Sequence, residues 1–270
     1  MTLAFRRPKP CALFAAAIGS LIFVVADTVA AAEHPRIAKA RAAERKSFTD
    51  AQIIEGFFKV TFGAEFQVAG VSDRIRKYDG PVRVFIENRA RPNRRHQVLA
   101  TLADIKDRIQ HLDIAPVETR SEANVVVMLV RDRDLARTMR SIYGGERARR
   151  ILKSLQPQCL SSFGRDDRFR ITRSEVILVA DAGDFTFYDC AYEELLQALG
   201  PINDDASVPW SMFNDKVNLG FFGVYDQYVL NILYHPRIRP GMTREEVRAI
   251  LPEVLPEVRA WVAQVNKLPP

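Results

Sequence analysis

The segment from Glu193 to Asp204 carries polar side chains at a spacing that could surround one metal ion. If this segment is a helix that ends at Gly200, Glu193 and Gln197 lie four residues apart and share one face. Gly200 would then turn the chain so that Asn203 and Asp204 return toward that face. These side chains offer oxygen atoms, which suit calcium or magnesium, whereas zinc prefers imidazole and thiolate ligands. The interpretation that these residues favour most is that no catalytic metal binds. A hard divalent cation comes second, and zinc comes last.

The same spacing resembles that of the metzincin-type zinc peptidases, His-Glu-x-x-His-x-x-Gly-x-x-His. In that motif the histidines hold zinc, and the glutamate acts as general base on the zinc-bound water. In this chain Glu193, Gln197 and Asn203 stand at the three ligand positions, Glu194 at the general base and Gly200 at the turn. The skeleton of the motif is present, but every ligand histidine is replaced.

The chain also resembles a bacterial family called domain of unknown function 2927. The resemblance rests on Cys190, Glu193-Glu194, Gln197 to Gly200, Asn203-Asp204, Met212 to Asp215, and Leu233-Tyr234 with Pro240 to Met242. It covers the second half of the chain closely and the first half only by architecture. It implies a zincin-like α/β (α+β) fold with a mixed sheet, a long active-site-type helix and a helical C-terminal portion. Met212 would lie in a methionine-containing turn beneath the site. No activity is assigned to that family.

Three functions are compatible with these residues. The first is a zincin-like domain without catalytic zinc that binds a peptide or an envelope polymer. The second is an active hydrolase in which Glu194 is the general base, helped by a metal or by a second carboxylate. The third is a structural protein of the envelope. The residues expected to form the binding site are Glu193, Gln197, Asn203, Asp204 and Met212, in a cleft beside Glu194 and rimmed by residues 205–222.

Each function predicts a different environment for these side chains. An enzyme predicts a carboxylate with a strongly shifted pKa in an open cleft. A binding domain predicts polar groups whose hydrogen bonds are satisfied and whose pKa values are unshifted. A structural protein predicts that Glu193 and Gln197 are covered by neighbouring chain. Asp184, Asp189, Glu193 and Glu194 could also supply the paired carboxylates of glycoside hydrolysis, although such residues are also typical of a charged helix start.

Residues 1–32 are typical of a secretory signal. Arg6, Arg7 and Lys9 precede an apolar run from Cys11 to Val25, and small residues follow, with cleavage expected after Ala32. An uncleaved membrane anchor is the alternative, but the run is shorter than the roughly 20 residues that span a bilayer. We therefore expect a periplasmic or secreted protein without a transmembrane segment in the mature chain.

Cleavage would leave two cysteines, Cys159 and Cys190. An even number of cysteines in an oxidising compartment favours a disulfide. A thiol that acts as metal ligand or nucleophile is the alternative.

Composition indicates an ordinary globular protein with a mild positive charge. The 270 residues are 47% hydrophobic and 27% charged, with a net charge of +6. Residues 1–32 contribute +2 of this, and the remaining +4 is too small to argue for nucleic-acid binding. A basic stretch from Arg131 to Lys153 could meet an anionic surface or could be an ordinary solvated helix face. We expect a linker or loose helix over residues 33–46 and one domain over residues 47–270.

Hydrophobic periodicity predicts strands that alternate with helices, followed by a mainly helical C-terminal part. The expected strands cover residues 81–87, 124–130 and 175–180. The expected helices cover residues 49–62, 97–112, 134–143, 146–155, 189–199, 224–234 and 243–250, with a final helix that ends near residue 266. Residues 200–222 form the longest irregular stretch, and irregular stretches of this length inside domains are often functional.

Overall fold

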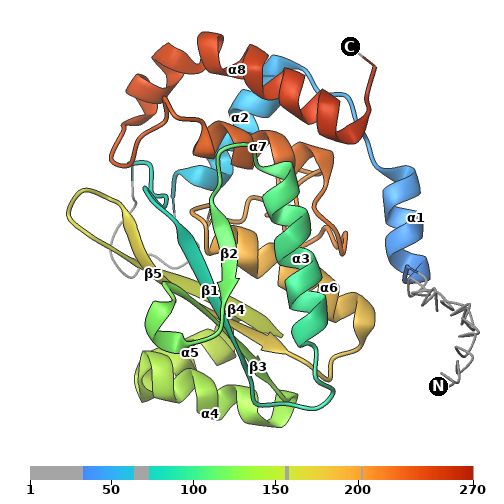
Figure 1. Cartoon of the computed structure of the whole chain (residues 1–270), viewed down its shortest axis with the longest axis vertical. Helices are drawn as coiled ribbons and strands as arrows, with labels where there is room; N and C mark the ends of the chain where they lie inside the picture. Colours follow the sequence, from blue (N-terminus) through green and yellow to red (C-terminus); the bar gives the residue numbers. More distant parts are fainter. Residues whose placement is uncertain (1–32, 64–72, 156–157, 202, 270) are drawn as a thin grey trace, which may run out of the picture. The chain divides into compact units, whose positions relative to one another are not determined.

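The computed structural model describes residues 33–63, 73–155, 158–201 and 203–269 (Figure 1). The predicted export signal, residues 1–32, lies outside the described residues. No helix in the described ranges is both long enough and apolar enough to cross a membrane.

A five-stranded mixed sheet lies at the centre of the fold and confirms the α/β class expected from the sequence. Its strands are β1 (Val82–Asn88), β2 (Ile114–Val117), β3 (Val125–Val130), β4 (Cys159–Arg165) and β5 (Ile171–Val179). The spatial order is β2-β1-β3-β5-β4, and all neighbours are parallel except β4, which pairs antiparallel with β5 at one edge. The sheet therefore presents an antiparallel edge strand beside the last parallel strand.

Both faces of this sheet are covered by helices, which is typical of a sheet whose central strand is a continuous apolar run. Side chains alternate along β3, so that Val127 and Leu129 join the main core while Met128 and Val130 join a second core on the opposite face. Helices α4 (Asp132–Tyr143) and α5 (Gly145–Leu155) cover the second core. Helices α3 (Arg95–Arg108) and α6 (Asp184–Gln197) cover the main core (Figure 1).

The C-terminal part is helical, as predicted. Helix α7 (Val224–Tyr234) is buried at every position, and α2 (Asp50–Thr61) and α8 (Arg244–Asn266) pack against it. Two successive helices were predicted after residue 243, but α8 is continuous and contains Pro252 and Pro256. Both prolines are exposed, so the backbone carbonyls that lack a donor at these positions can be solvated.

Residues 33–46 contain the helix α1 (Pro35–Ala43) rather than a free linker. The guanidinium of Arg36 lies 3.7 Å from the centroid of the Phe185 ring, and Ile37 is buried in the main core. The Glu44 carboxylate accepts a hydrogen bond of 2.6 Å from the backbone N–H of Val224, at the start of α7. These contacts dock the segment against the domain.

Candidate functional site

Helix α6 carries the candidate site and is held on almost every side. It follows β5 directly and packs against both β4 and β5. Ten of its fourteen residues are buried, which excludes the interpretation of this segment as a solvated surface helix. A helix that is buried nearly all round can hold its side chains in fixed directions.

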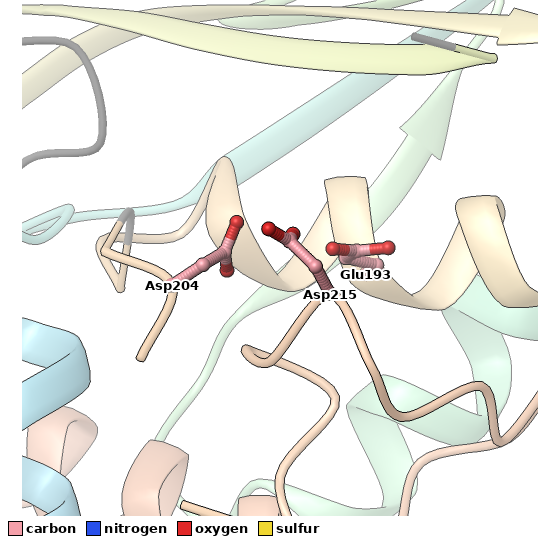
Figure 2. Close-up of side chains that lie close together, drawn as sticks. All are labelled: Glu193, Asp204 and Asp215. Carbon is pink, nitrogen blue, oxygen red and sulfur yellow. The ribbon is translucent and has the colours of Figure 1, made fainter. Parts of the chain in front are cut away.

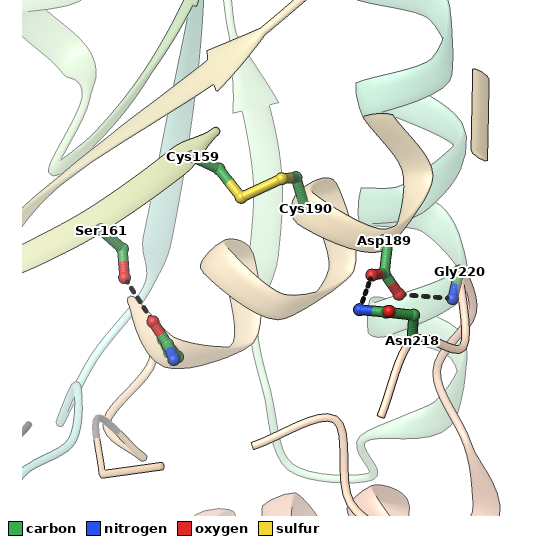
Figure 3. Close-up of a disulfide and its surroundings, with 7 residues drawn as sticks. Cys159, Ser161, Asp189, Cys190, Asn218 and Gly220 are labelled. Atoms are coloured by element: carbon green, nitrogen blue, oxygen red, sulfur yellow. Dashed lines mark hydrogen bonds between the residues drawn. A yellow bond between two sulfur atoms is a disulfide. The ribbon is translucent and has the colours of Figure 1, made fainter. Parts of the chain in front are cut away.

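A disulfide joins this helix to the edge strand. Cys159 in β4 is bonded to Cys190 in α6, with their Cα atoms 5.8 Å apart (Figure 3), so the predicted pairing is confirmed. A second link lies two residues further along β4, where the Ser161 hydroxyl donates a hydrogen bond of 3.1 Å to the Gln197 side-chain oxygen. The helix is therefore fastened to β4 near its middle and at its C-terminal end.

Two buried aspartates hold the irregular stretch after α6 in place, Asp189 on α6 and Asp226 on α7. Asp189 accepts hydrogen bonds from the Asn218 side chain at 2.8 Å and from the Gly220 N–H at 2.9 Å (Figure 3). Asp226 in α7 accepts hydrogen bonds from the Ser211 hydroxyl at 2.5 Å and from the Met212 N–H at 3.0 Å. These contacts fix the two ends of the segment that contains Asp215.

Three carboxylates converge where this stretch returns to the helix. Glu193 of α6, Asp204 and Asp215 each offer an oxygen, and these oxygens all lie within 4.8 Å of one another. Figure 2 shows the Asp204 and Asp215 side chains directed toward each other beside Glu193. We call these three residues the carboxylate cluster. Glu193 and Asp204 are partly buried and Asp215 is exposed, so the cluster brings three like charges together at the edge of the fold.

The pKa of Glu193 is raised well above its ordinary value in this cluster. Burial is the largest cause, followed by the charges of Glu194, Asp204, Asp189 and Asp215. A carboxylate in this position either keeps its proton or needs a positive charge close to it. Such shifts are typical of functional sites, although structural networks can also produce them.

The other residues predicted for the site have different positions. Gln197 is buried and donates a hydrogen bond of 3.1 Å to Asp204, so it supports the cluster from behind. Asn203 is turned away, because its side chain donates to the backbone oxygen of Lys59 at 2.8 Å. Met212 is buried in the core, and Glu194 is buried next to Glu193. The structure thus brings Glu193 and Asp204 together, with Gln197 behind them, and leaves Asn203 out.

The remaining carboxylates considered for hydrolysis are held by other partners. Asp184 forms an ion pair of 2.5 Å with the buried Arg94, and Asp189 binds the loop as described. Asp215 completes the cluster but was not predicted as a ligand. Its position in an irregular stretch, 22 residues after Glu193, provides no periodic pattern from which the contact could be inferred.

The geometry does not fit a zinc site of the metzincin type. The three positions that would hold the ligands are occupied by glutamate, a glutamine bonded to two neighbours, and an asparagine that faces away. The side chains that do converge are carboxylates, which suit calcium or magnesium. No step of a zinc-dependent reaction can therefore be derived from these residues.

Gly200 makes the turn that returns the chain to the cluster. Its φ is +142°, and a Cβ atom at this position would lie 2.4 Å from the backbone oxygen of Arg76. We expect Gly200→Ala to lower the free energy of unfolding by about 2–3 kcal/mol, measured by denaturant titration. Gly145→Ala is the control, because it begins a helix and a Cβ atom there would have no atom within 4 Å. Equal stability of the two variants would contradict the close approach at Gly200.

Comparison with known proteins places the chain in one family. Residues 50–253 match the family described as "Protein of unknown function (DUF2927)". The chain belongs to the DUF2927 family. No match is found among curated proteins. The DUF2927 match covers the whole sheet, α6 and the carboxylate cluster, and its description assigns no activity, so the function has to be argued from the site.

The basic stretch noted in the sequence forms the outer surface of the α4–α5 hairpin. Residues 131–155 contain eight basic and three acidic residues, a net charge of +5 that exceeds the +4 of residues 33–270. Leu135, Met139 and Ile151 face the sheet, while the basic side chains lie on the opposite side. Charge is therefore segregated between the basic hairpin and the rest of the domain.

Proposed function

We propose that this protein is an exported, zincin-like domain that lacks catalytic zinc and binds a hard divalent cation, calcium or magnesium, at the carboxylate cluster. The observation that carries this proposal is the convergence of Glu193, Asp204 and Asp215, with ligand oxygens within 4.8 Å of one another. This distance is compatible with oxygens that share one ion, since calcium–oxygen distances are about 2.3–2.6 Å.

Electrostatics support a cation at this position. Three carboxylates that are close together repel one another, and the raised pKa of Glu193 reflects first the cost of burial and then repulsion by neighbouring carboxylates, Asp204 and Asp215 among them. A divalent cation would remove the repulsion and allow all three groups to ionise. Gln197 supports Asp204 by a hydrogen bond, which would keep that carboxylate oriented as an ion binds.

Binding of a cation would create a place for an acidic partner. Calcium takes about six to eight oxygen ligands, and three carboxylates do not supply all of them. The remaining positions would be filled by water or by a carboxylate of the partner, either a peptide or an envelope polymer. In this interpretation the cation connects the domain to its ligand and takes part in no reaction.

The zincin-like frame is supported by the arrangement of the motif. Helix α6 follows the last parallel strand, Gly200 makes the turn after it, and Met212 is buried in the segment that comes next. The residues at the zinc-ligand positions argue against catalysis by zinc, as described above. The resemblance therefore supports the frame of such an enzyme without its metal chemistry.

Export is supported by two features. Residues 1–32 have the basic start, apolar run and small residues of a secretory signal. The disulfide between Cys159 and Cys190 is the second feature, because disulfides are rare in proteins that stay in a reducing cytosol.

A hydrolase that depends on carboxylates is the second candidate, and the raised pKa of Glu193 favours it. A carboxyl group whose pKa is raised can act as a general acid, and two further carboxylates lie beside it in the cluster. Glu194, the residue at the general-base position of the motif, is buried beside Glu193. Under this candidate Glu193→Gln would abolish hydrolysis, with or without added cations.

The deciding experiment measures thermal unfolding and metal content of the mature protein from residue 33 onward. Calcium at about 100 times its Kd should stabilise the fold by about 2.7 kcal/mol, which corresponds to a rise in Tm of roughly 5–10 °C. Glu193→Gln should lose this rise. At pH 8 without cations this variant should also be more stable than the wild type, because it removes a partly buried carboxyl group that neighbouring carboxylates repel when it is ionised.

Asp167→Asn is the matched control, since Asp167 is an exposed acidic residue outside the carboxylate cluster. It should retain the full response to calcium. Stoichiometric zinc in the purified protein would overturn the proposal. If neither calcium nor magnesium changes the Tm, the hydrolase candidate becomes the one to test.

A further inference from the structure

A cavity of about 330 Å³ lies away from the carboxylate cluster and shares no residue with it. Its wall is formed by residues 77–81, before β1, by residues 111–113, after α3, and by four residues at and after the end of α7, Tyr234, Pro236, Ile238 and Arg239. This volume is at the lower end of the range for small-molecule sites.

A buried ammonium group forms part of the wall. Lys77 is only 6% exposed, and its Nζ donates hydrogen bonds to the backbone oxygens of Leu233 at 2.8 Å and Ile238 at 2.9 Å. An ammonium group has three hydrogens, so two are used and one is left. Among the described residues no carboxylate lies within ion-pair distance of this nitrogen, and burial lowers the pKa of Lys77 to about 8.

The two carbonyl bonds give Lys77 a structural role, because it binds the Leu233 carbonyl in the last turn of α7 and the Ile238 carbonyl in the segment that follows. A solvent-exposed side chain could also donate to these carbonyls. Binding them therefore does not explain why the charge of Lys77 is buried without a counter-ion. A buried cation is normally paired, since removing it from water is costly. An anion in the cavity would provide the missing charge.

The remaining charged groups of the wall favour an anion as well. Arg239 is exposed, and although its charge contributes to lowering the pKa of Glu246, it forms no ion pair within 4.0 Å among the described residues. The negative charge of Asp113 is neutralised by two hydrogen bonds from Arg83, at 2.9 and 3.0 Å. Asp79 is exposed to solvent. Its negative charge raises the pKa of Lys77, but burial has the larger effect and lowers it. Lys77 and Arg239 therefore dominate the wall.

We propose that this cavity binds a small organic anion, with its carboxylate or phosphate group bonded to Lys77 and Arg239 and its apolar body against Tyr234, Pro81 and Ile238. The lining residues combine a few convergent cationic donors with an apolar surface, which is the usual composition of a small-molecule site. The Lys77 Nζ lies over the ring of Tyr234, 5.0 Å from its centroid, so an anion that reaches the ammonium would lie close to this aromatic side chain.

Calorimetric titration of the mature protein with benzoate, phenyl phosphate and benzyl alcohol tests this proposal. The two anions should bind and the neutral alcohol should not, and the stronger anion identifies the carboxylate or the phosphate as the preferred group. Lys77→Met should weaken binding of that anion at least about tenfold, as expected for loss of a charged hydrogen bond.

Arg239→Gln keeps the proposal testable if Lys77→Met fails to fold, because Arg239 is exposed. This substitution should weaken binding of the anion about three- to tenfold. Arg237→Gln is the matched control, since Arg237 lies two residues away, pairs with Glu253 and is not part of the wall. Its affinity should stay within about twofold of the wild type.

A measurement on the unaltered protein completes the test. Labelling of Lys77 by acetic anhydride, followed by peptide mass spectrometry, should slow when the preferred anion is present. The proposal is overturned if neither anion binds, if benzyl alcohol binds equally well, or if Arg239→Gln and Arg237→Gln have the same affinity. All titrations contain a chelator, so their outcome does not depend on a cation in the carboxylate cluster.

Discussion

Replacing Cys159 and Cys190 together by serine is expected to lower the free energy of unfolding by about 3–4 kcal/mol. The disulfide closes a loop of 31 residues, and a crosslink of that span removes conformational entropy from the unfolded chain by this amount. The native state loses a direct connection between the edge strand β4 and α6 at the same time. Few single interactions in the domain should contribute as much.

Denaturant titration of the double variant and of the oxidised wild type measures this effect. Ser161→Ala is the control, because it removes only the hydrogen bond from Ser161 to Gln197 and should cost about 1 kcal/mol. Equal midpoints for the double variant and the wild type would mean that the disulfide contributes nothing to stability.

Hydrogen exchange shows where the double variant is loosened. Cys190 lies one turn before Glu193, so exchange should increase at the backbone amides of α6. The carboxylate cluster depends on the position of α6, and its affinity for calcium should fall in the same variant. A reducing environment should have the same consequence.

The helices were predictable where local residues define their ends. Helix α7 was predicted to the residue, because its apolar run is bounded by Gly223 and Pro236. Helix α6 begins at Asp184, five residues before the predicted start, because Asp184 to Tyr188 lack a cap that sequence alone could identify. Burial against the sheet, rather than a local signal, makes these first residues helical.

The strand β4 was missed for a physical reason. Its residues include Ser161, Ser162 and Gly164, which have weak strand preference, and it is an edge strand with half-exposed side chains. Its pairing with β5 and the disulfide to α6 stabilise it, and both are contacts between separate segments. A single sequence contains little information about such contacts.

The site was predictable only in part for the same reason. Glu193 and Gln197 share a helix face, which follows from helical spacing, and Gln197 indeed supports the cluster. The position of Asn203 depends on Lys59 and Val60, whose backbone oxygens accept its two hydrogen bonds from more than 140 residues away. Asp215 joins the cluster because Asp189 and Asp226 fold the intervening loop. Neither result could be derived from spacing.

The environments of Glu193 and Gln197 distinguish among the functions considered at the outset. Gln197 is buried and hydrogen-bonded to Ser161 and Asp204, as a structural role predicts. Glu193 has the raised pKa that was expected of an enzyme, whereas unshifted polar groups were expected of a binding domain. A purely structural protein has no need to hold three carboxylates together at a free-energy cost. That cost is explained if a cation or a reacting group offsets it when bound, which both candidate functions provide.

Stability of the protein should fall as pH rises from about 4 to about 7, and Asp226 should be a main cause. Asp226 is fully buried, and burial raises its pKa from 3.8 to about 7 despite the hydrogen bonds from Ser211 and Met212. Because the folded-state pKa is higher than the unfolded one, the folded protein binds more protons within this range. The stabilising contribution of protonated Asp226 is therefore complete below pH 4 and is lost as the pH approaches 7. The shift of about three pH units corresponds to on the order of 3–4 kcal/mol.

Asp226→Asn should remove most of this pH dependence. The amide can accept from the Met212 N–H and donate to the Ser211 hydroxyl, so it reproduces the protonated acid without a charge. The variant should match the wild type near pH 4 and be more stable than it at pH 8, as measured by denaturant titration across this range. Equal slopes for the two proteins would show that Asp226 is ionised in the folded state at neutral pH.

Calcium separates the contribution of Asp226 from that of the carboxylate cluster. Glu193 also has a raised pKa, so it adds to the loss of stability with rising pH. A bound cation would favour ionised Glu193 and should reduce that part of the slope, while the part due to the buried Asp226 should be unchanged. In Asp226→Asn with calcium, the remaining slope should therefore be smaller than in either single condition, and it should come from the other carboxylates whose pKa burial raises, Asp189 and Glu44. If calcium leaves the slope of this variant unaltered, the cation does not bind at Glu193.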